Sequence, residues 1–231
     1  MTKTLEEYKK GELLLIDKPL KWSSFQVVNK IRWHLRKTFN IKKIKVGHAG
    51  TLDPLATGLL IICTGKMTKQ IEKFQTQTKG YSGTITLGSS TPSYDLETVI
   101  NQRFATNHIT KALIYQTAKE FEGTIMQYPP IYSALKKDGK RLYEFARAGK
   151  EVSICARQIN IYSLKITAIK NLEVDFQIQC SKGTYIRSLA YDFGKALKSG
   201  GHLSSLRRTS IGNFSVNDAM SIEHFIESLK V

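Results

Sequence analysis

The spacing of apolar residues predicts a chain in which strands alternate with helices. Short apolar runs at residues 11–17 and 57–64 are typical of buried strands, and residues 81–87 alternate as a half-buried strand does. Residues 158–169 and 172–180 also alternate, on either side of a Lys-Asn pair, which favours a β-hairpin. One further strand is expected over residues 206–216.

Helices are expected between these strands. Ser23, with Gln26 three residues later, has the pattern of a capping box, and Val28, Ile31 and Leu35 then repeat at helical spacing. Further helices are expected over residues 110–122, 184–198 and 221–229. Because hairpins outnumber strand–helix–strand crossovers, we expect an α/β fold of the α+β type, with a mixed, mainly antiparallel central sheet flanked by helices and loops.

The composition indicates a globular protein with an anionic partner. The chain of 231 residues has 35 Lys and Arg against 19 Asp and Glu, a formal charge of +16, and 41% hydrophobic residues, so the charge does not signal disorder. Without a long apolar run or a signal-peptide pattern, we expect a cytoplasmic protein with no membrane contact. Three scattered cysteines without a CxxC motif predict neither a disulfide framework nor a metal site.

The positive charge is concentrated in three stretches. Residues 18–52 carry nine Lys or Arg and no carboxylate, and residues 136–150 carry six Lys or Arg against two carboxylates. Arg207 and Arg208 form the third cluster. A single basic run is often only a solvated face, but three such runs with interleaved aromatic residues favour phosphate binding and base stacking, and thus a nucleic-acid partner.

Residues 47–58 (GHAGTLDPLATG) are the most informative segment. Their three glycines permit a tight loop that brings backbone close to a ligand, and Pro54 restricts Asp53 to extended geometry. Asp53 is the first carboxylate after the cation-rich stretch, so nearby positive charge favours its ionised form, which can act as a nucleophile or base. An Asp-Pro turn beside a structural histidine, His48, is the alternative that these residues leave open.

This segment closely resembles the signature of the TruB family, the tRNA pseudouridine-55 synthases. Other segments resemble further family motifs in the same order: GELLLIDKP with WSS, KGY with LG, QYPPIYSALKKDGKRLYEFARAG, and CSKGTYIRSLAYDFG with HLSSLRR. The resemblance implies a pseudouridine synthase fold, a single catalytic domain over residues 1–231 and an RNA-gripping insertion around residues 127–150. A C-terminal PUA-type module is not expected, because only one short helix follows HLSSLRR.

The resemblance also implies an activity: the isomerisation of uridine 55 in the T-loop of tRNA to pseudouridine after base flipping, with no metal and no cofactor. Asp53 corresponds to the catalytic aspartate, which attacks the target nucleotide so that the uracil detaches and rejoins through carbon. Tyr81 corresponds to the tyrosine that stacks on the base, and it is left open whether its hydroxyl also takes a proton. Arg187 corresponds to the arginine that pairs with the aspartate.

The remaining site residues follow from the same resemblance. Substrate-binding residues are expected to be His48, Tyr81, Tyr185 and Leu206, although core packing is an alternative for the last two. RNA-backbone contacts are expected at Lys136, Lys137, Lys140, Arg141, Arg207 and Arg208. Lys18 is expected to support the loop of Asp53 rather than touch substrate. In the run TPSYD, which departs from a more acidic family pattern, Asp95 alone is expected to join the active-site network.

The expected partner is the T-stem-loop of tRNA, bound by a monomer that needs no protein partner. Two other functions stay open: a synthase of the same fold that is guided by RNA or acts on another substrate, and a non-catalytic RNA-binding and folding module. A guided synthase usually needs additional domains, for which 231 residues leave no room. The joint presence of Asp53, Tyr81 and Arg187 argues against the non-catalytic module.

Overall fold

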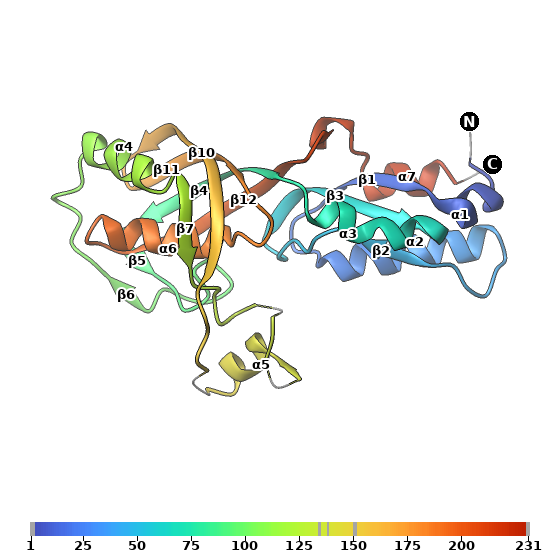
Figure 1. The fold of residues 1–231 in the computed structure, drawn as a ribbon, viewed down its shortest axis with the longest axis horizontal. Coiled ribbons are helices and arrows are strands. Elements are labelled where there is room, and N and C mark those ends of the chain that lie inside the picture. The colour runs from blue at the N-terminus through green and yellow to red at the C-terminus, as the bar shows by residue number, and fades with distance from the viewer. Residues whose placement is uncertain (1–2, 134, 138, 150–151, 230–231) are drawn as a thin grey trace. The chain divides into compact units, whose positions relative to one another are not determined.

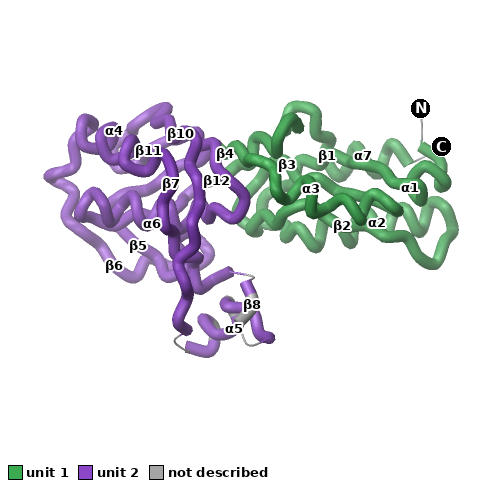
Figure 2. The backbone as a smooth tube through the Cα atoms, viewed as in Figure 1, with its two compact units in different colours: residues 1–81, 206–231 green, residues 82–205 purple. Residues whose placement is uncertain are grey.

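The computed structural model describes residues 3–133, 135–137, 139–149 and 152–229, which fold into two compact units (Figures 1 and 2). Unit 1 contains residues 1–81 and 206–231, and unit 2 contains residues 82–205. The chain passes from one unit to the other within strand β4 (Lys79–Leu87) and returns within strand β12 (Gly201–Ile211). The expected single catalytic domain over residues 1–231 stays a prediction.

Unit 1 is built around strand β3 (Ala56–Thr64). It pairs antiparallel with β1 (Leu13–Lys18) and β2 (Val46–His48), and parallel with β12, which in turn pairs with β13 (Phe214–Ser215). The helices are α1 (Leu5–Gly11), α2 (Ser24–Thr38), α3 (Ile71–Gln75) and α7 (Ile222–Glu227), with the short 3-10 helices η1 (Gly65–Gln70) and η2 (Val216–Asp218).

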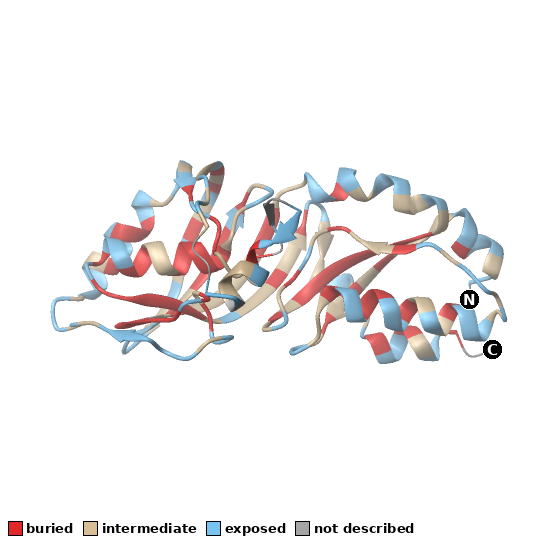
Figure 3. Cartoon of the chain, turned by 90° about the horizontal axis from the view of Figure 1, so that it is seen from below, coloured by how far each residue is buried: buried red, intermediate tan, exposed pale blue. Residues whose placement is uncertain are grey.

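Both faces of β3 are covered, which explains its continuous apolar sequence. Successive side chains of a strand point to opposite faces, so Leu60 and Ile62 pack with the apolar stripe of α2, whereas Leu59 and Ile61 join a second cluster with Phe74. Figure 3 shows this pattern as buried residues along the strands and along one side of the helices. The predicted capping box at the start of α2 is confirmed.

In unit 2 the strand order is β12-β4-β11-β10-β7. Strands β10 (Arg157–Lys170) and β11 (Glu173–Cys180) form the predicted hairpin, and β7 (Gly123–Gln127) pairs with the other edge of β10. Helix α4 (Lys111–Glu120) contacts both β10 and α6 (Ile186–Ala196). The smaller elements are β5 (Ser89–Ser90), β6 (Gln102–Arg103), β8 (Lys136–Lys137), β9 (Lys140–Arg141) and α5 (Leu142–Arg147).

The predicted fold class is confirmed, since most strand pairs are antiparallel and helices flank the sheet. One expectation is wrong in its bounds: the last long strand begins at Gly201 rather than near residue 206. Gly201 packs so close to Gly194 of α6 that a Cβ on either would overlap the other's backbone, so only glycine fits at these two positions. None of the described helices is long and apolar enough to cross a membrane.

Gly58 in β3 offers a test of how closely β3 and β12 approach. Its φ is +100°, and a Cβ there would overlap the backbone of Arg208. We expect Gly58→Ala to lower the free energy of unfolding by about 3 kcal/mol or more in urea titrations, because backbone strain and overlap add. Gly123→Ala is the matched control, because φ is +95° there and nothing lies within 4 Å of the added Cβ. An equal loss of unfolding free energy in the two variants would contradict the close approach of β3 and β12.

Candidate active site

The loop that carries Asp53 connects β2 to β3 in unit 1. Asp53 is half-buried, and its carbonyl accepts a hydrogen bond of 3.0 Å from the Ala56 N–H, which closes a turn just before β3. Gly50 has a φ of +108°, in the left-handed region that favours glycine. The sequence therefore predicts correctly that this segment is a tight loop.

Two side chains from the start of the chain hold this loop. Ser24, in the first turn of α2, bonds both backbone groups of Leu52: its Oγ donates to the carbonyl (3.1 Å) and accepts from the N–H (2.8 Å). Lys18 is fully buried at the end of β1, and its Nζ donates to the carbonyl of Trp22 (2.5 Å) and, at the long limit of 3.5 Å, to that of Pro54. These contacts match the expectation that Lys18 supports the loop.

A third support comes from the far end of the sequence. The guanidinium of Arg208, in β12, donates to the carbonyls of Gly50 (3.0 Å), Thr51 (3.4 Å) and Leu59 (2.8 Å). The side chain is only 1% exposed, so it presents no face to a phosphate in this conformation. The structure therefore gives Arg208 a different role from the expected RNA contact: it holds the Asp53 loop against β3.

The neighbouring Arg207 differs because successive side chains of a strand point to opposite faces. It is partly exposed and forms a two-pronged ion pair with Asp17, at 2.6 Å and 3.0 Å. An Arg-Arg pair within a strand can therefore place only one of its members on a given face. The sequence pattern treated both arginines alike because it placed them in a strand over residues 206–216 without assigning a face of the sheet to each.

Charges and burial set the protonation of the groups around the loop. Burial lowers the pKa of Lys18 to about 8, the Arg208 charge acts in the same direction, and the Asp53 carboxylate opposes both. That opposing interaction is mutual, so the Lys18 ammonium stabilises an anion at Asp53. Burial, followed by the Arg208 charge, also lowers the pKa of His48, so its imidazole is neutral at pH 7.

The structure places three more predicted residues in unit 1. Leu206 lies directly beside Ala56 in the parallel pair of β12 and β3, at the end of β3 where the Asp53 turn closes. Tyr81 is half-buried in β4. His48 ends β2, opposite Ile62, and precedes the loop. Unit 1 thus gathers Asp53, His48 and Leu206 around one loop and the strand that follows it.

In unit 2 the predicted Arg187 is the centre of a buried network. It lies in the first turn of α6 and donates to the carbonyls of Ser93 (3.2 Å) and Tyr132 (2.9 Å). Its Nε is 3.6 Å from Oδ2 of Asp95, and the other carboxylate oxygen of Asp95, Oδ1, accepts a hydrogen bond of 2.6 Å from the Ser93 hydroxyl. Asp95 therefore pairs with Arg187, whereas a pairing of Arg187 with Asp53 stays a prediction.

The basic insertion is only partly described. Lys140 and Arg141 are exposed in β9, which forms a small hairpin with β8. The backbone of Lys136 and Lys137 forms β8, but their side chains lie outside the described residues. Both side chains are therefore in contact with solvent.

Exposed aromatic residues on α2 were missed by the sequence analysis. Phe25 is 64% exposed and Trp33 is 51% exposed, and the Lys37 ammonium lies 5.0 Å from the Trp33 ring centroid. Their spacing along the helix is compatible with either buried or exposed positions. Only the structure shows that both side chains are exposed. This face adds aromatic surface to the basic stretch of residues 18–52.

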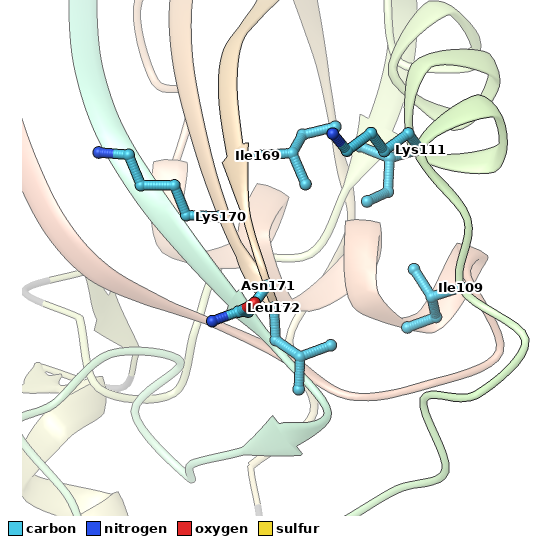
Figure 4. A pocket seen from close by; sticks show the side chains of 7 residues that line it. Ile109, Lys111, Ile169, Lys170, Asn171 and Leu172 are labelled. Carbon is cyan, nitrogen blue, oxygen red and sulfur yellow. The ribbon is translucent and has the colours of Figure 1, made fainter.

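Unit 2 also has a pocket of about 430 Å³ between the start of α4 and the turn of the β10–β11 hairpin (Figure 4). It is lined by Ile109, Lys111, Ile114, Ile169, Lys170, Asn171 and Leu172. None of the predicted site residues lines it, and the Lys170 side chain points away from Ile109 in Figure 4. We assign this pocket no part in the chemistry.

Comparison with known families identifies the class. Residues 36–186 match the family described as "TruB family pseudouridylate synthase (N terminal domain)", and residues 187–230 match the "tRNA pseudouridylate synthase B C-terminal domain". The chain belongs to the TruB family of pseudouridylate synthases, which are isomerases. The predicted family and enzyme class are confirmed.

Individual relatives agree with this assignment. The tRNA pseudouridine synthase B of Flavobacterium johnsoniae is 60% identical over 98% of this chain and 100% of that protein. The enzyme of the same name from Phocaeicola vulgatus is 52% identical over 96% of this chain and 94% of that protein. A chain in the crystal structure of a Cbf5-Nop10-Gar1 complex superimposes with a TM-score of 0.71 at 28% identity, and this protein covers 55% of its length. The predicted pseudouridine synthase fold is therefore confirmed.

The buried Lys18 generates a prediction about pH. A lysine in an unfolded chain has a pKa of about 10.4, whereas the pKa of the folded Lys18 is about 8. Between about pH 8 and pH 10 the folded state therefore binds fewer protons than the unfolded state, and the free energy of unfolding rises with pH. We expect the difference in unfolding free energy between wild type and Lys18→Met to grow in favour of wild type over this range. The exposed Lys30→Met should show a flat difference. A flat difference for Lys18→Met would contradict the burial of its amine.

Proposed function

We propose that this protein converts uridine 55 in the T-loop of tRNA to pseudouridine, with Asp53 as the nucleophile and the target base flipped out of the RNA. Support for the substrate comes from relatives named tRNA pseudouridine synthase B, which match over nearly the whole chain. The observation that carries the assignment of Asp53 is its loop, which is fixed from three elements by Ser24, Lys18 and Arg208.

A fixed loop is what this chemistry requires. A nucleophile is effective when it is held about 3–3.5 Å from the atom that it attacks, and loss of about 1 Å in placement can cost about 100-fold in rate. Asp53 attacks the target nucleotide as an anion, which the nearby Lys18 ammonium stabilises. The glycosidic bond to nitrogen breaks, the uracil turns, and a bond to carbon replaces the bond to Asp53, which leaves as a free carboxylate. One proton leaves that carbon and one joins the freed nitrogen, so the product is an isomer.

Aromatic and basic groups account for RNA binding. Extruding a base costs a few kcal/mol, and stacking returns about 1–3 kcal/mol per base, which we assign to Tyr81 and to the neutral ring of His48. Tyr185 and Leu206 are proposed to contact substrate, and Arg187 to serve Asp53 as the resemblance implies. The proposed enzyme acts in the cytoplasm as a monomer on the T-stem-loop, without a protein partner and with no cofactor.

Asp53→Asn tests the nucleophile. The amide is nearly isosteric but cannot attack as an anion, so we expect pseudouridine formation in tRNA to be abolished while tRNA affinity stays within about twofold of wild type. The measurement is pseudouridine content in unmodified tRNA after incubation with each purified protein. Asp218→Asn is the control, for which we expect wild-type activity, because Asp218 is exposed at the end of η2 and has no assigned role. Conversion of uridine 55 by Asp53→Asn would remove the assignment.

Neutralising the insertion tests the RNA path. If about six to eight phosphates are neutralised, the logarithm of affinity should fall with the logarithm of salt concentration at a slope of about −4 to −7. Replacing Lys136, Lys137, Lys140 and Arg141 together by Gln should weaken binding strongly and flatten that slope. The rate at saturating tRNA should change much less, because none of the four is assigned to the reacting bond.

The matched control neutralises four exposed lysines elsewhere in unit 2: Lys111, Lys119, Lys165 and Lys170. This control changes the net charge by the same amount, so only contacts specific to the insertion distinguish the two variants. Equal changes of slope in the two variants would show that the insertion is not the preferred path of the RNA.

A further inference from the structure

The insertion leaves and rejoins the sheet at two residues that are paired with each other. Strand β7 ends at Gln127 and strand β10 begins at Arg157, and these residues are direct partners in the antiparallel ladder. The chain therefore leaves the sheet at Gln127 and returns to it at Arg157. Figure 1 shows the segment with α5 connected to the sheet through the ends of these two strands.

Both Gln127 and Arg157 contact Tyr185, the N-cap residue of α6. The buried Gln127 amide makes two bonds to its backbone: Nε2 donates to the carbonyl (3.0 Å) and Oε1 accepts from the N–H (2.8 Å). The Arg157 guanidinium lies 4.5 Å from the Tyr185 ring centroid and also donates to the carbonyl of Gly183. Two bonds from one planar amide fix the orientation of Tyr185, which a single bond would leave free to turn.

The first turn of α6 also binds the beginning of the insertion. The Ser188 hydroxyl donates to the carbonyl of Tyr128 (2.7 Å), and Arg187 donates to the carbonyl of Tyr132 (2.9 Å). A shift of residues 128–132 therefore acts directly on Arg187 and Ser188, two consecutive residues of α6. Arg187 belongs to the predicted site, as does Tyr185, which Gln127 holds.

We propose that Gln127 and Arg157 are positioning residues, which couple the RNA-gripping insertion to the orientation of Tyr185 in the substrate site. This inference rests on the proposed function, in which Tyr185 contacts the substrate. An apolar side chain could fill the buried position of Gln127, but it could not orient a neighbouring backbone. Gln127 and Arg157 thus set the rate of conversion on bound tRNA rather than the affinity for tRNA.

Two substitutions separate hydrogen bonding from space filling. In Gln127→Glu the ionised carboxylate still accepts from the Tyr185 N–H but repels the Tyr185 carbonyl, whereas the protonated form makes both bonds. Burial raises the pKa of such a carboxyl above its ordinary value of about 4.3, while the positive charge of Arg157, its partner in the ladder, opposes that rise. The assay therefore extends to about pH 5.5 to reach the protonated form. Gln127→Met has a similar volume and can make neither bond at any pH.

The experiment measures the single-turnover rate of pseudouridine formation at saturating tRNA, as a ratio to wild type, from about pH 8.5 to about pH 5.5. For Gln127→Glu we expect this ratio to rise about tenfold as the pH falls, while Gln127→Met stays about tenfold or more below wild type throughout. Affinity for tRNA should stay within about twofold of wild type in both variants. The control is Gln158→Glu, the same change at the exposed neighbour of Arg157, whose ratio should stay near one.

Each other outcome counts against the inference. A wild-type rate in both variants would show that Gln127 only fills space, and a pH-independent ratio for Gln127→Glu would remove the two-bond arrangement. Lost affinity with an unchanged saturated rate would make Gln127 part of RNA binding. If Gln127→Met does not fold, Arg157→Lys, which keeps the charge but lacks the planar guanidinium, must show the same loss of rate.

The same assay with Asp53→Asn keeps the two proposals apart. If Asp53→Asn is inactive while the Gln127 variants behave as wild type, only the positioning role fails. If Asp53→Asn converts uridine 55, the proposed function itself fails, whatever the Gln127 variants show.

Discussion

The local geometry of Asp53 depends on one buried cation, the guanidinium of Arg208. A charge withdrawn from water is strongly destabilising unless hydrogen bonds compensate it, and here three carbonyl oxygens do so. Two of those carbonyls belong to the loop and the third to β3, so the same side chain that needs the bonds also fixes the loop. Lys18 and Ser24 hold the loop by the same means, with side-chain donors to its backbone.

The predicted site residues are divided between the two units along the sequence. Asp53, His48 and Tyr81 belong to unit 1, whereas Arg187 and Tyr185 belong to unit 2. In each unit, a side chain distant in sequence orders the backbone beside a predicted site residue: Arg208 next to Asp53, and Gln127 at Tyr185. Backbone carbonyls accept hydrogen bonds in both cases. Cationic and amide side chains can order this backbone because they carry N–H donors.

Local sequence patterns were sufficient for the fold class but not for these supports. The alternation at residues 158–169 and the capping box at Ser23 predicted real elements, because each depends on neighbours within one turn or one strand. The bonds of Gln127 to Tyr185 join residues 58 positions apart, so no local spacing could reveal them. Arg208 was misjudged because its burial depends on which face of β12 it occupies, and that register comes from pairing with β3.

The most direct test of this account is the rate of pseudouridine formation by Arg208→Lys on saturating, unmodified tRNA, measured in a single turnover. A lysine keeps the positive charge but cannot reach three carbonyls with a planar fork. We expect a rate about tenfold or more below wild type, with tRNA affinity within about twofold, because the loop loosens and no phosphate contact is lost. A wild-type rate with weakened affinity would contradict it, since Arg208 would then bind RNA instead of holding the loop of Asp53.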